Sequence, residues 1–233
     1  MIGYRMIEPE TYPRKAHLAY FMGMERPQFN ITADVDVTEL RRFCQEKGYS
    51  FFLSFLHIVA LSADAVPQLR QRIRRLTPEE ILLRGEAEVL PGGIEIREYA
   101  ECPTSHTETA GNGTYCYCAL HHHMPWEQYI RMAEELQRKA REKGSLEEDP
   151  EIEAFYFPTC IPWIHYRDVV HPMTDRFDSN PRFSWGKYEE DFRGRLMMPL
   201  TAAVHHGLVD GLHIAEFYRL VEENTAKLIS GGL

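Results

Sequence analysis

A histidine pair near the C-terminus has the residue types and the spacing for proton-transfer chemistry. Residues 204–211 read Val-His-His-Gly-Leu-Val-Asp-Gly. Histidine is the usual side chain for moving a proton near neutral pH, because its unperturbed pKa of about 6.5 leaves both forms accessible. If the backbone is extended there, the side chains of His205 and His206 point to opposite faces. We therefore expect one of them to do chemistry and the other to pack, with Asp210 orienting a neighbour or bracing the turn.

The flanking sequence predicts the elements that must position this pair. Residues 195–203 are largely apolar, which is typical of a buried strand, and residues 212–228 carry apolar side chains at helical spacing. The pair thus lies where a strand passes into a helix, and a rigid element can end there with a side chain aimed into a cleft. This position favours catalysis, although a histidine near an aspartate is more often structural.

The rest of the chain alternates between the two kinds of element. Periodicity and the positions of Gly and Pro predict a short helix at 12–21 within residues 8–23, with Pro13 in its first turn. Further helices are predicted over 39–47, capped by Thr38, and over 51–66 and 126–143. The predicted strands are 29–37, 70–75, one or two within 81–99, 114–120, 155–166, 182–188 and 193–206, and the predicted loops are 102–113 and 167–181. This interleaving predicts an α/β (α+β) two-layer sandwich, a mixed β-sheet packed with helices, in a single domain over residues 1–233.

Composition excludes several classes of function. The 233 residues have a formal net charge of -9, which argues against a nucleic-acid partner or an anionic membrane surface. No apolar run reaches the length of a membrane span, and residues 1–5 lack a signal-peptide core, so we expect a cytoplasmic protein. The five cysteines are odd in number and lack Cys-x-x-Cys spacing, as expected of reduced thiols.

Two short motifs raise the question of a metal. Cys116 and Cys118 would share one face of a strand, but small buried hydrophobic side chains are the commoner outcome for such a pair. In an extended run from His121 to His123, only the outer two histidines share a face, and no third ligand at a usual spacing is evident nearby. We therefore expect a polar strand end there and no bound metal.

The wider pattern His-His-x-x-x-Asp-Gly, with a strand before it and a helix after it, resembles the signature of the coenzyme A-dependent acyltransferases. This family includes chloramphenicol acetyltransferase and the catalytic domains of dihydrolipoyl acyltransferases. Further stretches resemble the chloramphenicol acetyltransferases in the right order and cover most of the chain. The resemblance implies that the second histidine, His206, is the general base. It also implies that Arg14 pairs with Asp210, which makes this aspartate a structural brace.

Other site residues are implied by the same resemblance. Residues 159–163, Thr-Cys-Ile-Pro-Trp, resemble the family's Ser-Ala-Leu-Pro-Trp, which implies that the Thr159 hydroxyl stabilises the oxyanion of the tetrahedral intermediate. Residues 181–188 resemble a segment that contacts coenzyme A. The implied cofactor contacts are Trp163, Ser184 and Tyr188, and the implied acceptor contacts are Tyr20, Phe21 and Phe29.

The reaction that the resemblance implies is O-acetylation of the antibiotic-resistance type. Neutral His206 takes the proton of an acceptor hydroxyl as the oxygen attacks the thioester of acetyl-coenzyme A, in a ternary complex without an acyl-enzyme. Chloramphenicol is the leading acceptor, and the family assembles as a homotrimer with each site at a subunit boundary. Two departures leave the acceptor open: Phe21 stands where the family carries a tyrosine, and Phe157-Pro158 stands where an asparagine is expected.

Two alternatives remain. The first is an acyltransferase of the dihydrolipoamide class, or one for another small hydroxyl acceptor; the paired histidines and the matches at Arg14 and Pro162-Trp163 argue against the lipoamide class. The second is a non-catalytic trimer that only sequesters a ligand. The presence of His206, Asp210 and a hydroxyl at position 159 disfavours it, because a binding protein needs none of them.

Overall fold

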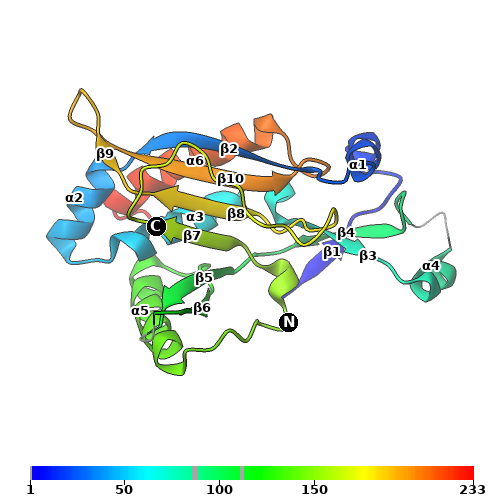
Figure 1. The fold of residues 1–233 in the computed structure, drawn as a ribbon, viewed down its shortest axis with the longest axis horizontal. Helices are drawn as coiled ribbons and strands as arrows, with labels where there is room; N and C mark the ends of the chain where they lie inside the picture. The colour runs from blue at the N-terminus through cyan, green and yellow to red at the C-terminus, as the bar shows by residue number, and fades with distance from the viewer. Residues whose placement is uncertain (1, 86–88, 111–112) are drawn as a thin grey trace.

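A mixed sheet runs through the middle of the computed structural model, which describes residues 2–85, 89–110 and 113–233. Its strands lie in the order β2-β10-β8-β7, and a short strand, β9, also pairs with β10. β10 is antiparallel to both of its long neighbours, whereas β7 runs parallel to β8 (Figure 1). The strands are β2 (Gln28–Asp36), β7 (Phe157–Ile161), β8 (Arg182–Gly186), β9 (Glu189–Glu190) and β10 (Leu196–His205).

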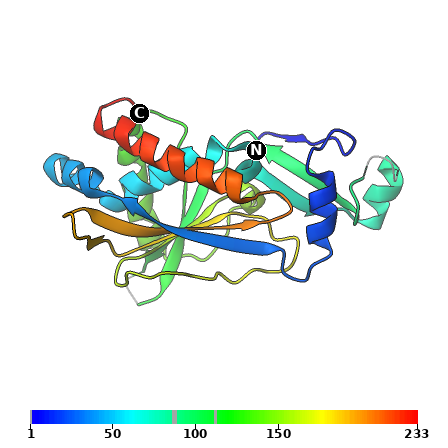
Figure 2. The ribbon, with the colours of Figure 1, turned by 90° about the horizontal axis from the view of Figure 1, so that it is seen from above.

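Helices cover one face of this sheet, as Figure 2 shows. α6 (Gly211–Ile229) follows β10 and begins at Asp210, whose side chain accepts a hydrogen bond from the N–H of Leu212. α3 (Phe51–Asp64) lies beside α6 and is buried on nearly all sides, as its continuous apolar sequence predicts. The buried residues of α6 are Ile214, Phe217, Val221, Asn224 and Leu228. The sequence prediction of a mixed sheet packed with helices is confirmed.

Smaller elements extend this core. A three-stranded sheet has the order β1-β4-β3, and a two-stranded sheet pairs β5 with β6. No helix of the described residues is long and apolar enough to cross a bilayer. The remaining elements are β1 (Tyr4–Met6), α1 (Lys15–Met22), α2 (Thr38–Lys47), η1 (Pro67–Arg70), β3 (Gln71–Arg75), α4 (Pro78–Arg84), β4 (Ile94–Tyr99), β5 (Thr104–Thr109), β6 (Tyr115–Leu120), α5 (Trp126–Lys143) and η3 (Ile152–Ala154).

The prediction of a loop over 102–113 is wrong, because part of this segment forms β5. The inward-facing side chains of β5 are polar, so the sequence lacks the apolar alternation that marks a strand. His106 and Glu108 are buried and hydrogen-bond each other, and Gln137 of α5 binds the same carboxylate. These bonds satisfy the Glu108 carboxylate that the strand turns inward, whereas Nδ1 of His106 is buried with no hydrogen-bond partner among the described residues.

Three helix starts also differ from the predictions. Residues 81–84, expected to begin a strand, belong to the helix α4, because Thr77 and Glu80 close a capping box and Pro78 occupies the first turn. Thr38 is inside α2 rather than its cap: Val37 holds the cap position, and Asp36 accepts hydrogen bonds from the Thr38 N–H and hydroxyl. Pro13 precedes α1, whose cap is Arg14. Residues 86–88, within the predicted strands of 81–99, lie outside the described residues.

The histidine run after β6 is arranged differently from the expectation. His122 and His123, rather than His121 and His123, point to one place, because the chain leaves the extended conformation at Leu120. Nε2 of both rings lies close to one oxygen of Asp64, at the end of α3, at 2.9 Å for His122 and 2.5 Å for His123. A third side chain of ligand type is thus present, brought in from a segment distant in sequence.

The loop of residues 162–181 crosses the other face of the sheet, as Figures 1 and 2 show together. Tyr166 donates its hydroxyl hydrogen to the carbonyl of Ser184, and Nε2 of His171 lies 2.5 Å from the Ser184 hydroxyl. At the far end, Nε2 of His205 lies 3.0 Å from the carbonyl of Arg176. Gly186 lets the loop lie close, because a Cβ there would be 2.6 Å from the carbonyl oxygen of Ile164.

We expect Gly186→Ala to lower the free energy of unfolding by about 1–3 kcal/mol, the usual cost of forcing extra volume into a packed site. Urea unfolding measures the change. Gly211→Ala is the matched control, because a Cβ there meets nothing within 4 Å, and alanine in the first turn of α6 should change stability by less than about 1 kcal/mol. Equal losses in both variants would contradict the close approach of the loop.

His205 should make the protein less stable in mild acid. Burial lowers the pKa of His205 to about 4, against the opposing hydrogen bond to the Arg176 carbonyl. The unfolded chain, with a pKa of about 6.5, takes up the proton first, so up to about 3 kcal/mol of stability is lost as the pH falls from 6.5 to 4. His205→Gln removes this titration, so its unfolding free energy should vary less over that range. Parallel pH profiles for the two proteins would refute this origin.

Candidate active site

The turn after β10 separates the roles of the two histidines. Both nitrogens of His205 are engaged: Nδ1 accepts from the N–H of Gly207, so Nε2 carries the hydrogen that it donates to the Arg176 carbonyl. His205 is also buried, at 1% exposure. His206 is the first residue past the strand, and its N–H donates to the carbonyl of Pro27 at 2.9 Å. His205 therefore packs, and His206, which is only half-buried, remains accessible.

One ring nitrogen of His206 is fixed as the donor. Nδ1 lies 3.0 Å from the carbonyl oxygen of Val209, which can only accept, so Nδ1 carries the hydrogen of the neutral ring. Nε2 then holds the lone pair, and no bond to Nε2 is recorded among the described residues. Phe21 stacks on the ring with 4.0 Å between centroids, and Phe29 lies against it at 4.4 Å. The turn thus holds an imidazole lone pair in a fixed direction.

Arg14 ties this turn together from the start of α1. Its Nη1 lies 2.6 Å from a carboxylate oxygen of Asp210, its Nη2 donates to the carbonyl of His206 at 3.1 Å, and its Nε donates to the carbonyl of Gly207 at 3.4 Å. Burial alone would raise the pKa of Asp210, but the hydrogen bond and charge of Arg14 outweigh it, so this pKa is lowered. The pairing that the resemblance implies is present, and it acts on the backbone around His206.

Gly207 is a requirement of the site that the sequence analysis missed. A Cβ at this position would lie 2.9 Å from Leu18 and 3.0 Å from the ring of His205. The backbone of the turn therefore passes directly against α1 and the packed histidine. The sequence could have indicated this close approach of the backbone, because a glycine stands immediately after the histidine pair.

The sheet register separates Thr159 from His206 within one chain. Thr159 is opposite Ser184 on β8, and Ser184 is opposite Thr201 on β10. Thr159 is therefore level with Thr201, two strands from β10, whereas His206 follows Thr201 by five residues. With strands about 4.8 Å apart and a rise of about 3.3 Å per residue, the two backbones are roughly 20 Å apart. A single chain does not bring these side chains together.

The other residues that the resemblance implies lie on the sheet, on the loop of residues 162–181 and on α1. Ser184 is fully buried and its hydroxyl faces His171. The hydroxyl of Tyr188 accepts a hydrogen bond from Nε of Arg41 at 2.9 Å. Trp163 is 79% exposed on the loop of residues 162–181, and Tyr20 is 68% exposed on α1, edge-on to Phe21. Of the implied acceptor contacts, Phe21 and Phe29 contact the His206 ring, whereas Tyr20 contacts Phe21.

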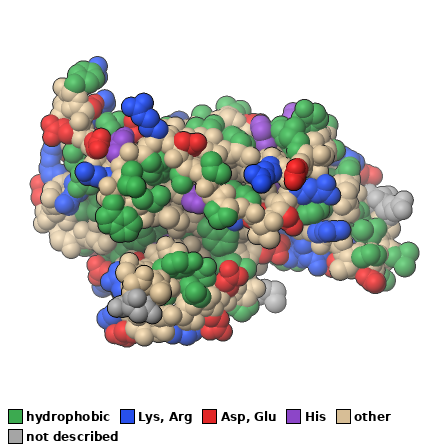
Figure 3. Space-filling view, in the orientation of Figure 1, with side chains coloured by type: hydrophobic (Ala, Val, Ile, Leu, Met, Phe, Trp, Pro, Cys, Tyr) green, Lys and Arg blue, Asp and Glu red, His purple; other side chains and the backbone are tan. Residues whose placement is uncertain are grey.

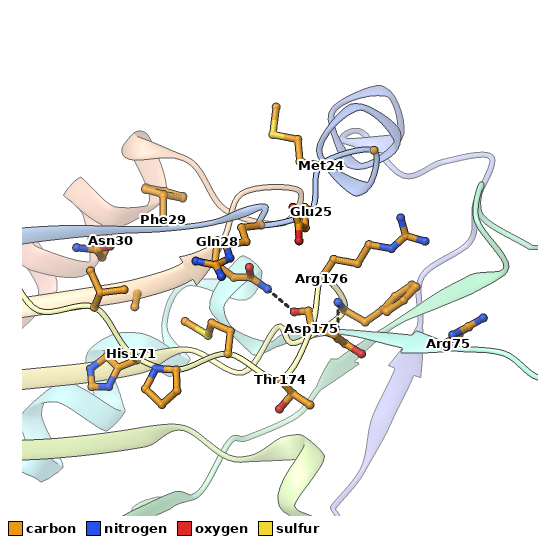
Figure 4. A pocket seen from close by; sticks show the side chains of 17 residues that line it. Met24, Glu25, Gln28, Phe29, Asn30, Arg75, His171, Thr174, Asp175 and Arg176 are labelled. Atoms are coloured by element: carbon orange, nitrogen blue, oxygen red, sulfur yellow. Dashed lines mark hydrogen bonds between the residues drawn. The ribbon is translucent and has the colours of Figure 1, made fainter.

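A cavity of about 890 Å³ opens between β2 and the loop of residues 162–181. Figure 4 shows Gln28 reaching from β2 toward the loop, where its amide donates to the carbonyl of Asp175 at 2.9 Å. Phe29, which contacts the His206 ring, also lines the cavity. The volume lies in the range of small-molecule sites. The remaining lining residues are Gly23, Met24, Glu25, Arg26, Asn30, Arg75, Val170, His171, Pro172, Met173, Thr174, Arg176, Phe177 and Ala203.

Apolar side chains gather on the face that Figure 3 shows, over the loop of residues 162–181. Besides Trp163, the large exposed ones on this loop are Ile164 at 57% and Val170 at 76%. Ile31, on the edge strand β2, is 36% exposed. Exposed apolar groups that gather on one face commonly mark a surface for another molecule.

Comparison with known proteins places this arrangement in a family. The family model described as chloramphenicol acetyltransferase matches residues 2–78 and 107–222. A chloramphenicol acetyltransferase of Klebsiella sp. is 22% identical over 95% of this chain and 93% of its own, and one of Bacillus pumilus is 20% identical over 89% of this chain and 87% of its own.

Solved structures agree on the fold. A chloramphenicol acetyltransferase structure superposes with a TM-score of 0.76 at 21% identity, covering 95% of this chain and 99% of that chain. A probable dihydrolipoamide acetyltransferase of Listeria monocytogenes superposes with a TM-score of 0.61 at 18% identity, covering 91% of this chain and 90% of that chain. The chain is an acyltransferase and belongs to the chloramphenicol acetyltransferase family.

Proposed function

We propose that this acyltransferase moves an acetyl group from acetyl-coenzyme A to a hydroxyl of a small acceptor, with chloramphenicol as the first candidate. The observation that supports this most is the fixed tautomer of His206, whose Nδ1 hydrogen faces the Val209 carbonyl and leaves Nε2 as a base. In the proposed step, Nε2 takes the acceptor's hydroxyl proton while the oxygen forms a bond to the thioester carbon. The carbonyl then reforms as the thiolate of coenzyme A leaves, and the proton on His206 returns to the sulfur.

Four side chains orient His206 for this step: Arg14, Asp210, Phe21 and Phe29. The guanidinium holds the carbonyls of His206 and Gly207, so the turn cannot rotate the ring away from its direction. Phe21 and Phe29 confine the ring from its flanks and offer apolar surface to the acceptor. Because Phe21 has no hydroxyl, an acceptor that needs a hydrogen bond at this place must receive it from elsewhere.

The oxyanion is proposed to be stabilised by the Thr159 hydroxyl of a neighbouring copy. Thr159 and His206 are roughly 20 Å apart within a chain by the sheet register, so one chain cannot supply both. A homotrimer with each site at a subunit boundary brings them together. The apolar side chains Trp163, Ile164 and Val170 give such a boundary buried surface. The cavity beside Phe29 offers the acceptor its path, and acetyl-coenzyme A approaches from the Tyr188 side.

Turnover with acetyl-coenzyme A and a panel of hydroxyl acceptors, chloramphenicol first, tests the proposal. Mass spectrometry of the acceptor and a thiol reagent for released coenzyme A are the measurements. Acetylated hydroxyl product supports the proposal. Turnover on dihydrolipoamide, with none on hydroxyl acceptors, would instead assign the chain to the lipoamide class. Tight binding of an acceptor without any acetylation would indicate a sequestering protein.

His206→Ala should lower kcat/KM on the best acceptor by at least about 10²–10⁴-fold, the usual contribution of a general base. Circular dichroism and the oligomeric state should not change, because the ring is only half-buried. His17→Ala, which removes an exposed imidazole of α1, is the control and should retain nearly full turnover. Near-full turnover of the His206 variant would refute its role as the base.

Thr159→Val keeps the shape of the side chain and removes its hydroxyl. We expect kcat to fall by about 10²–10³-fold, the usual cost of losing one oxyanion donor, while KM changes little. Thr159→Ser retains the hydroxyl and should retain most of the rate. If the serine and valine variants lose activity equally, the hydroxyl does not act on the oxyanion.

A further inference from the structure

Three side chains of metal-ligand type meet away from the proposed acyl-transfer site. Asp64, at the last residue of α3, is buried, and so is His122, whereas the side chain of His123 is 44% exposed. Their ligand atoms, one from each residue, all lie within 4.8 Å of one another. None of the three residues belongs to the cluster around His206. The mechanism proposed above makes no use of them.

The donor set suits a divalent transition metal. Nε2 of His122 and Nε2 of His123 lie 2.9 Å and 2.5 Å from the same oxygen of Asp64. A carboxylate oxygen only accepts, so each of these nitrogens presents a hydrogen to the point where the three groups meet. A cation there binds the lone pair of each Nε2, so the hydrogen of each neutral ring moves to Nδ1. Side-chain rotations are needed to give bonds of about 2.0–2.2 Å to each ligand. Two imidazoles and one carboxylate are a common ligand set for zinc, cobalt or ferrous iron.

The carboxylate of Asp64 is held by partners of its own. Its other oxygen accepts hydrogen bonds from the Tyr156 hydroxyl at 2.8 Å and from the N–H of Cys102 at 3.2 Å. These bonds fix the direction of the ligand oxygen, as outer partners do in metal sites. His122 has less support, because its Nδ1 is buried with no hydrogen-bond partner among the described residues. We therefore expect a lower affinity than at a site whose ligands are all held by outer partners.

The cluster has a path to solvent. A cleft of about 460 Å³ reaches His123 and is lined by two carboxylates, Glu101 and Glu151, and by His121. Acidic side chains at the mouth attract a cation. A water molecule can complete the coordination from this side, because the side chain of His123 is 44% exposed and lines the cleft.

We propose that Asp64, His122 and His123 form a binding site for one divalent transition-metal ion per chain, with water as the remaining ligand. The ion ties the end of α3 to the segment after β6. Its effect is therefore on stability, and its binding does not depend on the acetyl-transfer function.

Cobalt(II) is the probe, because its weak visible bands in water strengthen and shift when protein nitrogen and oxygen ligands bind it at lower coordination number. The full chain without an affinity tag is treated with a chelator, dialysed and titrated with cobalt chloride. We expect saturable binding of one ion per chain, and we expect the intensity of the visible bands to stop rising at one equivalent of cobalt. Thermal unfolding at about 100 times Kd should show Tm raised by roughly 5 °C or more.

His123→Ala is the main variant, because its half-exposed ring can be removed with little effect on folding. It should weaken cobalt binding by more than about tenfold, since even the loss of an outer partner costs 10–100-fold. His121→Ala is the matched control: the neighbouring histidine lies at the cleft but not at the cluster, so affinity and bands should be retained. Asp64→Asn, checked for folding by circular dichroism, should also lose the bands.

Three outcomes would overturn the proposal. The first is the absence of saturable binding by the unmodified chain. The second is equal cobalt affinity in the unmodified chain and in His123→Ala. The third is a loss of binding in His121→Ala as large as that in His123→Ala, which would place the ion in the cleft rather than on Asp64.

Discussion

The ion pair between Arg14 and Asp210 is the interaction on which the site depends. Asp210 has two tasks, because it begins α6 by accepting the N–H of Leu212 and also binds the guanidinium at 2.6 Å. Arg14 in turn holds the carbonyls of His206 and Gly207. One carboxylate and one guanidinium thus join α1, the turn after β10 and α6. The side chain of Arg14 is only 13% exposed, so its charge needs this partner.

The rigid sheet has a second consequence for function. Register fixes Thr159 level with Thr201, and no rotation of side chains crosses the distance from there to His206. Each chain therefore carries the two halves of the proposed site, His206 and Thr159, at two separate places on its surface. Association of identical chains around a symmetry axis repeats both halves and allows each His206 to face a neighbour's Thr159. The exposed apolar side chains of the loop of residues 162–181 are consistent with such contact.

The sequence predicted the parts of the fold that have strong periodic signals. The helix at 126–143 has the predicted bounds, and the strand before the histidine pair and the helix after it lie where the apolar pattern put them. The motif also led to His206, Asp210 and Arg14, which the structure brings together. The choice between His205 and His206 needed coordinates or the family resemblance, because alternation alone says only that one of them packs.

What the sequence could not predict depends on contacts between distant residues. β5 carries polar side chains inward, and their partner Gln137 belongs to a helix further along the chain. Asp64 meets His122 and His123 across more than fifty residues, so spacing rules for metal ligands gave no signal. The separation of Thr159 from His206 follows from strand order, which periodicity does not contain.

The central claim is that His206 of one chain and Thr159 of another act together, and mixed trimers test it directly. Chains carrying His206→Ala and chains carrying Thr159→Val, each nearly inactive alone, are co-expressed and the mixed assemblies purified by two different tags. If the site is shared, the boundary that joins an intact His206 to an intact Thr159 is active. Each purified mixed trimer has one such boundary of its three, so it should restore about a third of the unmodified rate. Mixed trimers that are no more active than either variant alone would contradict the account.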